Sequence, residues 1–126
     1  MLNALTMGSM SAMTKRKAAE VFPFLERYIA RKEEQIAEIE QVIERYEKKR
    51  LIEERNYQAM SSFRKIFAGK KPDHHLAVEY IHYVKRPMEQ IRQLRAEAEQ
   101  ARAILNGSKP SDYVAISDDL EKEIGL

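Results

Sequence analysis

The chain has 126 residues, and a third of them are charged, with 22 basic and 20 acidic side chains and a formal net charge of +2. This length fits one domain, and the absence of cysteine excludes disulfides and thiolate metal sites. No segment approaches the roughly 20 consecutive apolar residues of a membrane-spanning helix, so we expect a cytoplasmic protein with no membrane partner.

The first 13 residues hold four of the six methionines. They carry no positive charge and no sustained apolar run, so they do not resemble a secretory signal. The patterns along the chain predict three parts. These are a flexible leader over 1–13, a helical hairpin domain over 14–106, and a linker with a short acidic amphipathic tail over 107–126.

A long helix is predicted from Phe24 onward, because Pro23 is tolerated only near the start of a helix. Apolar residues recur alternately three and four positions apart, which is the repeat of a coiled-coil seam. The repeat fails over residues 48–54, where no Pro or Gly lies. We therefore favour one continuous helix with a shifted apolar face, and a separate second helix is the alternative. The seam comprises Phe22, Leu25, Ile29, Lys32, Ile36, Ile39, Ile43 and Tyr46.

The next strong stop lies at Gly69, which suits a helix C-cap, and Pro72 cannot continue a helix behind it. Asp73 is the expected N-cap of the returning helix, which ends at Asn106. Pro87 predicts a kink or break within that helix, because it removes a backbone donor and its ring collides with the preceding turn. The returning seam comprises Ala77, Tyr80, Val84, Pro87, Ile91, Leu94, Ala98, Ala101 and Leu105.

Two seams joined by a short turn predict an all-α fold, a long antiparallel helical hairpin that resembles a coiled coil. In that arrangement Glu33 would face Arg102 and Glu40 would face Arg95. Such exposed ion pairs contribute only about 0.2–1 kcal/mol each, so they specify orientation more than strength.

The C-terminal segment is acidic, with five carboxylates and one lysine over residues 111–126. Ser117 is the expected cap of a short helix over Asp118–Ile124. Two interpretations of this tail stay open. It can fold back on the basic part of the chain, or it can dock its apolar side into a partner.

Three side chains could ligate a divalent metal, because His75, Glu79 and His82 share one helix face. They lack a fourth ligand and the HExxH spacing, so exposed histidines without a metal are the favoured interpretation. Gly69 lacks the spacing of a phosphate-binding loop. We therefore predict no enzyme, no cofactor and no small-molecule substrate.

Basic side chains concentrate between residues 45 and 71, where nine lysines and arginines stand against three glutamates. Such a cluster can neutralise phosphates, although a solvated charged surface is the favoured interpretation. The candidate nucleic-acid contacts are Lys48, Lys49, Arg50, Arg64, Lys65, Lys70, Lys71, Lys85 and Arg86.

A long hairpin of this size exposes most of its surface and often needs a neighbour to cover its apolar stripe. The predicted function is therefore that of a non-enzymatic interaction protein, an adaptor or regulator that self-associates or packs on a protein partner. A nucleic-acid-binding regulator is the alternative. The candidate partner contacts are Tyr80, Ile81, Tyr83, Val84, Leu120 and Ile124.

Overall fold

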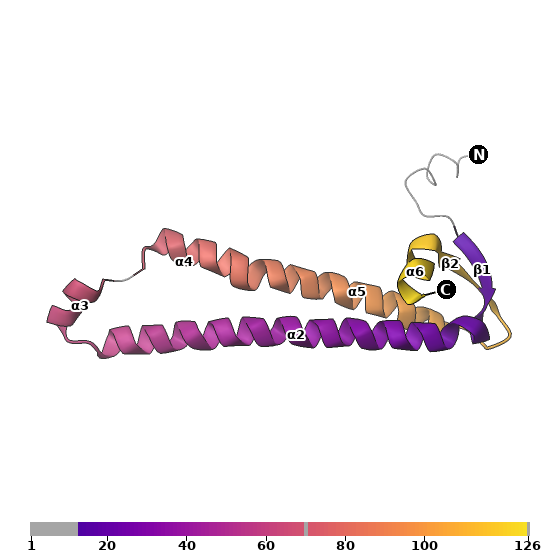
Figure 1. Ribbon diagram of the computed structural model, residues 1–126, viewed down its shortest axis with the longest axis horizontal. Coiled ribbons are helices and arrows are strands. Elements are labelled where there is room, and N and C mark those ends of the chain that lie inside the picture. Colours follow the sequence, from indigo (N-terminus) through magenta and orange to yellow (C-terminus); the bar gives the residue numbers. More distant parts are fainter. Residues whose placement is uncertain (1–12, 70, 126) are drawn as a thin grey trace, which may run out of the picture. The chain divides into compact units, whose positions relative to one another are not determined.

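The computed structural model describes residues 13–69 and 71–125 and is mostly helical (Figure 1). Two short strands correct the all-α expectation. The predicted leader lies outside the described residues except for Met13, which begins the first strand. The elements are β1 (Met13–Lys17), α2 (Ala18–Ala59), α3 (Ser62–Ala68), α4 (Asp73–Tyr80), the π-helix η1 (Ile81–Lys85), α5 (Arg86–Gly107), β2 (Tyr113–Ser117) and α6 (Asp118–Ile124).

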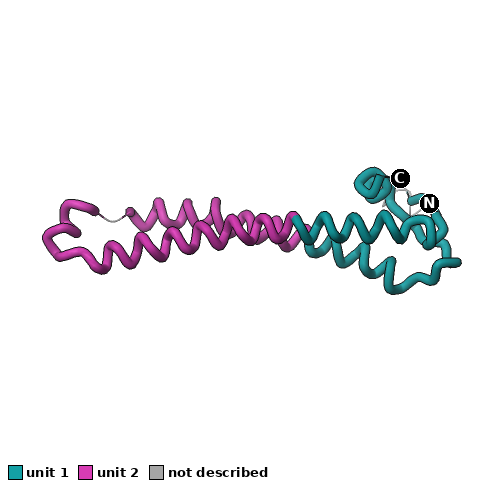
Figure 2. Tube along the Cα trace, turned by 60° about the horizontal axis from the view of Figure 1, so that its bottom comes forward, with its two compact units in different colours: residues 1–34, 95–126 teal, residues 35–94 magenta. Residues whose placement is uncertain are grey.

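The chain divides into two compact units, which Figure 2 shows in teal and magenta. Unit 1 consists of Met1–Glu34 and Arg95–Leu126, and unit 2 consists of Gln35–Leu94. Each unit has its own hydrophobic core, and both α2 and α5 contribute residues to each core. Within the described residues, no helix is both long and apolar enough to cross a membrane.

Helix α2 is continuous over 42 residues, which confirms the prediction that residues 48–54 do not interrupt it. The predicted start at Phe24 is wrong, since the helix begins at Ala18. The first two amides find acceptors in the loop before β2: Ala18 donates to the carbonyl of Asp112 (2.8 Å) and Ala19 to that of Pro110 (3.1 Å). These bonds satisfy N–H groups that an isolated helix end leaves without partners, so the helix extends upstream of Pro23.

Helix α2 ends at Ala59, ahead of the predicted stop, and α3 follows as a separate short helix. The Ser61 hydroxyl caps α3 by accepting a hydrogen bond from the Arg64 amide at 3.3 Å. Gly69 caps its C-terminus with a φ of 70°, a conformation that glycine adopts without strain. The Gly69 C-cap is therefore confirmed, but for α3 and not for the long helix.

Helix α4 begins at Asp73, and the residue in the N-cap position is Pro72, not Asp73 as predicted. Further along, the disturbance expected before Pro87 takes the form of the π-helix η1, not of a break. The Arg86 amide there donates to the carbonyl of Ile81, five residues back. A wider turn at this point accommodates a proline that can donate no hydrogen bond of its own.

Unit 1 combines the strand pair with α6 and parts of α2 and α5. β1 and β2 are antiparallel, with Thr14 opposite Ile116 (Figure 1). The predicted linker therefore contains a strand. The Ser117 hydroxyl accepts a hydrogen bond from the Leu120 amide at 3.1 Å, which confirms the predicted cap of α6. The buried core of unit 1 comprises Val21, Leu25, Tyr28, Ile29, Ala98, Ala101, Ile116 and Ile124.

Two charged groups of α2 support the packing of unit 1. Glu33 pairs with Arg102 at 2.6 Å, which confirms this predicted pair. Lys32, a seam position, is largely buried and contacts Glu97 (3.4 Å) and Glu123 (3.2 Å). Burial is the largest single influence on the pKa of Lys32 and lowers it, but the hydrogen bond to Glu123 and the nearby negative charges together outweigh burial, so the pKa is raised.

Unit 2 has a smaller core, formed by the predicted seams of both helical segments. Its buried members are Ile36, Ile43, Val84 and Ile91, with Ile39, Tyr46 and Leu94 packed against them. Ala77 and Tyr80 are exposed, so the returning seam begins to be buried only at Val84. The core of unit 2 therefore does not extend to α3 and α4, neither of which contains a buried residue.

Candidate interaction surface

Unit 2 exposes an unusual number of large apolar side chains beyond its core. Their exposed fractions run from 41% to 77%. Scattered apolar residues are normal on a protein surface, and only those that form a contiguous surface make a candidate interaction site. From Leu51 onward, the exposed large apolar residues of unit 2 are Leu51, Ile52, Phe63, Ile66, Phe67, Val78, Tyr80, Ile81, Tyr83 and Met88.

One part of this surface is concave. A groove of about 400 Å³ lies between α2 and the α4–η1 segment, and we call it the α2–α4 groove. Charges of both signs line it alongside the apolar side chains: two carboxylates and one guanidinium. The lining residues are Tyr46, Glu47, Arg50, Leu51, Glu54, Leu76, Tyr80 and Val84.

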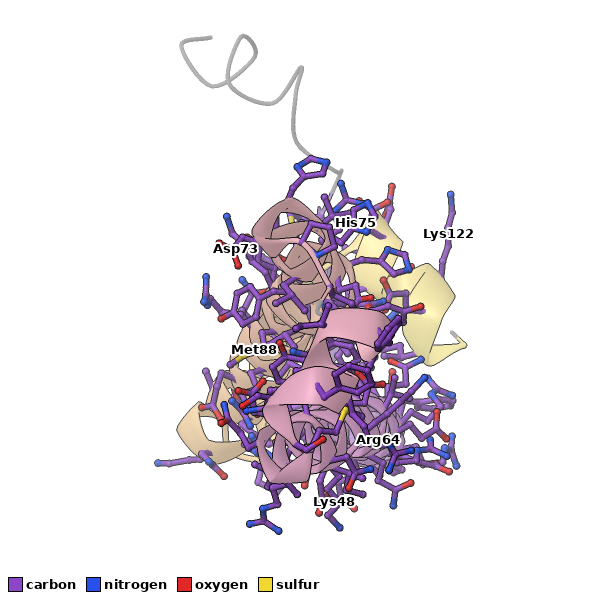
Figure 3. All side chains as sticks on the ribbon, turned by 90° about the vertical axis from the view of Figure 1, so that its left-hand side faces the viewer. Lys48, Arg64, Asp73, His75, Met88 and Lys122 are labelled. Atoms are coloured by element: carbon purple, nitrogen blue, oxygen red, sulfur yellow. The ribbon has the colours of Figure 1, made fainter. Side chains whose placement is uncertain are left out.

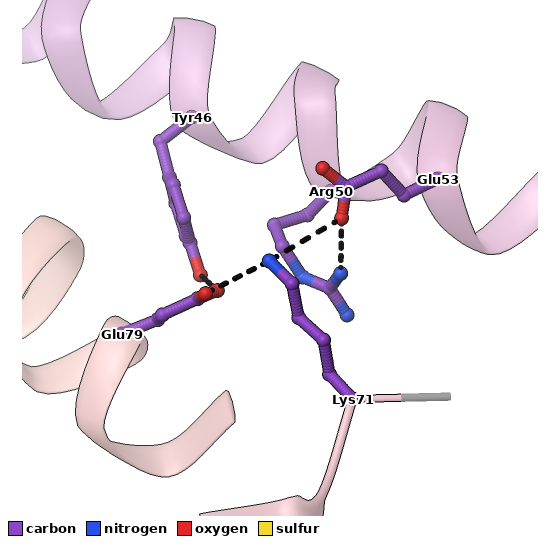
Figure 4. Close-up of polar contacts among 5 residues, drawn as sticks. All are labelled: Tyr46, Arg50, Glu53, Lys71 and Glu79. Carbon is purple, nitrogen blue, oxygen red and sulfur yellow. Dashed lines mark hydrogen bonds and ion pairs between the residues drawn. The ribbon is translucent and has the colours of Figure 1, made fainter. Parts of the chain in front are cut away.

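A polar network joins the chain after α3 to both walls of the groove (Figure 4). Lys71 contacts Glu79 of α4 at 2.8 Å and Glu53 of α2 at 3.7 Å. The Tyr46 hydroxyl donates to the other Glu79 oxygen at 3.1 Å, and Arg50 pairs with Glu53 at 2.8 Å. The two helical segments are thus connected by charge-assisted bonds next to the groove, where apolar burial is sparse.

Aromatic packing holds the same region. The Tyr46 ring stacks on Tyr83 of η1, with centroids 4.8 Å apart and planes inclined by 13°. His82 meets the Tyr83 ring edge-on at 4.8 Å. Such pairs contribute about 0.5–1.5 kcal/mol beyond their burial, so they help to position the π-helix beside α2.

The pKa values of Glu79, Lys71 and Tyr46 in this network are shifted in directions that favour their mutual contacts. Hydrogen bonding from Lys71 lowers the pKa of Glu79, and the Tyr46 hydroxyl adds to that effect. The bond to Glu79 raises the pKa of Lys71. Burial is the main cause that raises the pKa of Tyr46, followed by its bond to Glu79. At neutral pH the carboxylate, the ammonium and the phenol are therefore all in the forms that bind one another.

Acidification is expected to open this network. Because the folded-state pKa of Glu79 is lowered, its stabilising contribution is present above the ordinary glutamate pKa and is lost as the pH falls through the folded value. We expect the NMR signals of the Tyr46 ring to change in that acidic range. In Lys71→Met the midpoint of this change in the Tyr46 signals should move to higher pH. In Glu79→Gln the pH-dependent change should vanish. An unchanged midpoint in Lys71→Met would contradict this origin of the shift.

The predicted nucleic-acid contacts do not form one free basic surface. Lys48 pairs with Glu44 at 3.0 Å, Arg50 and Lys71 belong to the network, and Lys65 lies over the Tyr57 ring at 5.3 Å. The other described candidates, Lys49, Arg64, Lys85 and Arg86, are exposed, and Lys70 lies outside the described residues.

The three candidate metal ligands are placed in other surroundings. Glu79 is held by Lys71 and Tyr46, and the His82 ring packs on Tyr83. His75 lies near His74, with ring centroids 5.9 Å apart, and Figure 3 shows it on the opposite side of unit 2 from Lys48. Among the described residues, no three His, Asp or Glu side chains are grouped as they would need to be to hold an ion.

The predicted partner contacts divide into two groups. Tyr80, Ile81 and Tyr83 are exposed. Ile124 is buried and Leu120 packs against the core of unit 1, because α6 folds onto the strand pair, which corrects the assignment of these two residues as partner contacts. Val84 is buried in the core of unit 2 with Ile36 and Ile43 and also lines the α2–α4 groove. The sequence analysis also missed the network of Tyr46, Glu53, Lys71 and Glu79, whose members lie far apart in the chain.

Comparisons with protein-family models, with curated proteins and with solved structures found no match. The function of the chain is therefore inferred from the residues of this surface and their geometry.

Proposed function

We propose that this chain is a non-enzymatic helical interaction protein that packs against a second copy of itself through the α2–α4 groove. The observation that carries the proposal is the exposed apolar surface that continues past the core of unit 2 onto α4, a helix without one buried residue. Burying such a surface releases roughly 25 cal/mol per Å² of apolar area, which is the main driving force of association.

A second copy is supported by the mixed character of the groove. A symmetric dimer brings the same patch from each subunit together, so the patch must complement itself. Here the apolar part of the groove lining comprises Leu51, Leu76 and Val84 together with the Tyr46 and Tyr80 rings. The lining also holds both signs of charge, with Glu47 and Glu54 beside Arg50. Such a lining offers apolar side chains that can be buried together and charges of opposite sign that can pair across a two-fold axis.

Sedimentation velocity over a wide range of concentration tests this proposal. We expect a reversible monomer–dimer equilibrium for the full chain. Replacing Leu51 and Tyr80 by Ser should weaken the dimer roughly a hundredfold. Each half-exposed side chain has about 0.75 kcal/mol left to contribute on burial, and the two-fold axis counts both residues twice, which gives about 3 kcal/mol. Both side chains are about half exposed in the monomer, so their loss leaves the core of unit 2 intact.

Val42→Ser is the matched control, since Val42 is similarly exposed on α2 but does not line the groove. This variant should dimerise as the parent chain does. A strict monomer at every concentration would contradict self-association and leave a different protein as the occupant of the groove. Equal weakening by the control would place the interface elsewhere.

Nucleic-acid binding is the second candidate function, and the exposed Lys49, Arg64, Lys85 and Arg86 favour it. It ranks below the first because intramolecular ion pairs already engage Lys48, Arg50 and Lys71. A gel shift with duplex DNA and with RNA distinguishes the two. Complexes that weaken steeply with salt and are lost in Arg64→Gln/Lys65→Gln would favour nucleic acid.

The antiparallel hairpin also belongs to this proposal. It is supported by the seam spacing of the two long helical segments and by the cores of the separate units. Leu25 and Ala98 share the core of unit 1, and Ile36 and Ile91 share the core of unit 2. The pairing of Glu40 with Arg95 stays a prediction.

A further inference from the structure

Helix α3 is the least embedded part of unit 2. It contains no buried residue, and Phe63, Ile66 and Phe67 are 70%, 77% and 76% exposed. The two phenylalanines pack edge-on against each other, with ring centroids 5.0 Å apart. Ser61 and Gly69 cap the helix, so it is held in shape by local bonds without apolar burial.

The side chains of α3 divide into two faces. At 100° per residue, its three large apolar residues fall within an arc of about 100°. Arg64 and Lys65 fall outside that arc, on the remaining part of the helix. Figure 3 shows α3 in the foreground with Arg64 labelled beside it. An apolar arc with aromatic residues and a basic opposite face is the pattern of helices that lie in a membrane interface.

Basic residues predominate in the sequence around α3: residues 55–72 contain Arg55, Arg64, Lys65, Lys70 and Lys71 and no aspartate or glutamate. Glu53 and Glu54 line a pocket with Ala68 and Gly69 at the C-terminal end of the helix, and Lys71 pairs with Glu53 and Glu79, so Arg64 and Lys65 are the basic side chains that α3 itself offers to lipid. Each basic residue held near an anionic bilayer contributes about 1 kcal/mol of attraction. The basic side chains beside the apolar arc can extend toward lipid phosphates while the apolar side chains enter the hydrocarbon boundary.

From this geometry we infer that α3 is a membrane-surface anchor, which inserts Phe63, Ile66 and Phe67 into the interface of an anionic lipid bilayer. A groove on a partner protein suits these three side chains less well than a lipid interface does. Helix-in-groove recognition uses apolar anchors at i, i+3, i+4 and i+7, and counted from Phe63 the i+7 residue is Lys70. Single-stranded nucleic acid is also less well suited, since Ile66 cannot stack on a base and the two Phe rings already pack together.

This inference changes the expectation of no membrane partner. That expectation came from the lack of a membrane-spanning segment, which a surface anchor does not require. The anchor is also separate from the α2–α4 groove, because none of the three apolar residues of α3 lines that groove. Lipid binding and self-association can therefore fail independently.

Vesicle flotation of the full chain tests the anchor. We expect the protein to float with vesicles of phosphatidylcholine and phosphatidylglycerol and to stay behind with phosphatidylcholine alone. Phe63→Gln/Phe67→Gln should weaken binding at least about tenfold. Arg64→Gln/Lys65→Gln should weaken it about thirtyfold at low salt. The altered side chains are not part of either core, so the variants should remain folded, which circular dichroism checks.

Matched controls separate these effects from general changes of charge and hydrophobicity. Arg92→Gln/Lys122→Gln removes two exposed charges elsewhere in the chain, and Val42→Gln removes an exposed apolar side chain from α2. Both variants should float like the parent chain. Flotation with neutral vesicles alone, or equal flotation of the Phe63→Gln/Phe67→Gln variant, would overturn the anchor.

Fluorescence gives a second readout, because the chain contains no tryptophan. Phe67→Trp should show an emission shift to shorter wavelength when anionic vesicles are added. Tyr113→Trp, at an exposed position of β2, should show none. An unshifted Phe67→Trp would overturn the proposal, as would binding of RNA or DNA by a chain that does not float.

Discussion

Leu25→Ala is expected to lower the free energy of unfolding by about 3 kcal/mol, within a range of about 2–5 kcal/mol. Leu25 is fully buried in the core of unit 1, where Val21, Tyr28 and Ala98 also lie. The substitution removes buried methyl groups and leaves a cavity that a long helix cannot easily close. Urea denaturation followed by circular dichroism measures the change.

Leu51→Ala provides the matched control for this prediction, since it removes the same atoms from the same helix. Leu51 is 49% exposed, so its loss should cost about 1 kcal/mol or less. Equal losses in the two variants would contradict the assignment of Leu25 to the core. Leu51→Ala should also weaken self-association, which makes the two variants opposite in their effects on stability and on assembly.

Ile116→Ala is expected to destabilise unit 1 by a comparable amount, about 2–5 kcal/mol. Ile116 is the fully buried residue that β2 contributes to the core of unit 1, and Val114 packs against the same core. It also stands opposite Thr14 in the strand pair. Its truncation should loosen the strand pair along with the core, and faster amide hydrogen exchange across β1 and β2 would report this directly.

Tyr113→Ala is the control in the same strand, because Tyr113 is 69% exposed. It should change the free energy of unfolding by less than about 1 kcal/mol. At this exposed position the change comes from the strand preference of tyrosine more than from lost burial. If the two variants behaved alike, β2 would not be anchored through Ile116. The predicted linker and tail would then be a peripheral segment and not part of the core of unit 1.

Local patterns determined much of this protein. The alternating spacing of Leu25, Ile29, Ile36 and Ile43 predicts which face of α2 is buried, and all four are buried. Ser117 begins α6 as predicted, because an N-cap depends on neighbours two or three residues away. Tyr80, Ile81 and Tyr83, which the sequence predicts as partner contacts, are exposed.

Only the tertiary structure decided the contacts between distant segments. β1 and β2 are separated by most of the chain, and neither Met13–Lys17 nor Tyr113–Ser117 carries a strong strand pattern alone. The start of α2 depends on carbonyls of Pro110 and Asp112, which no local pattern around Ala18 can supply.

The polar network shows the same division between local and distant information. A basic segment is visible in the sequence, but the bonds of Lys71 to Glu53 and Glu79 depend on where the chain after α3 returns to α2. Those bonds change Lys71 from a candidate phosphate contact into a link between two helical segments.

The buried face of a helix and its caps depend on neighbours within one or two turns. Strand pairing and long-range ion pairs form only when the fold brings distant segments of the chain together. The sequence therefore determined that Leu25, Ile29, Ile36 and Ile43 of the long helix are buried, because their spacing puts them on one face. The tertiary structure decided the burial of Val21 and Tyr28, which lie outside the predicted seam, and which charged and apolar residues remain available to a partner.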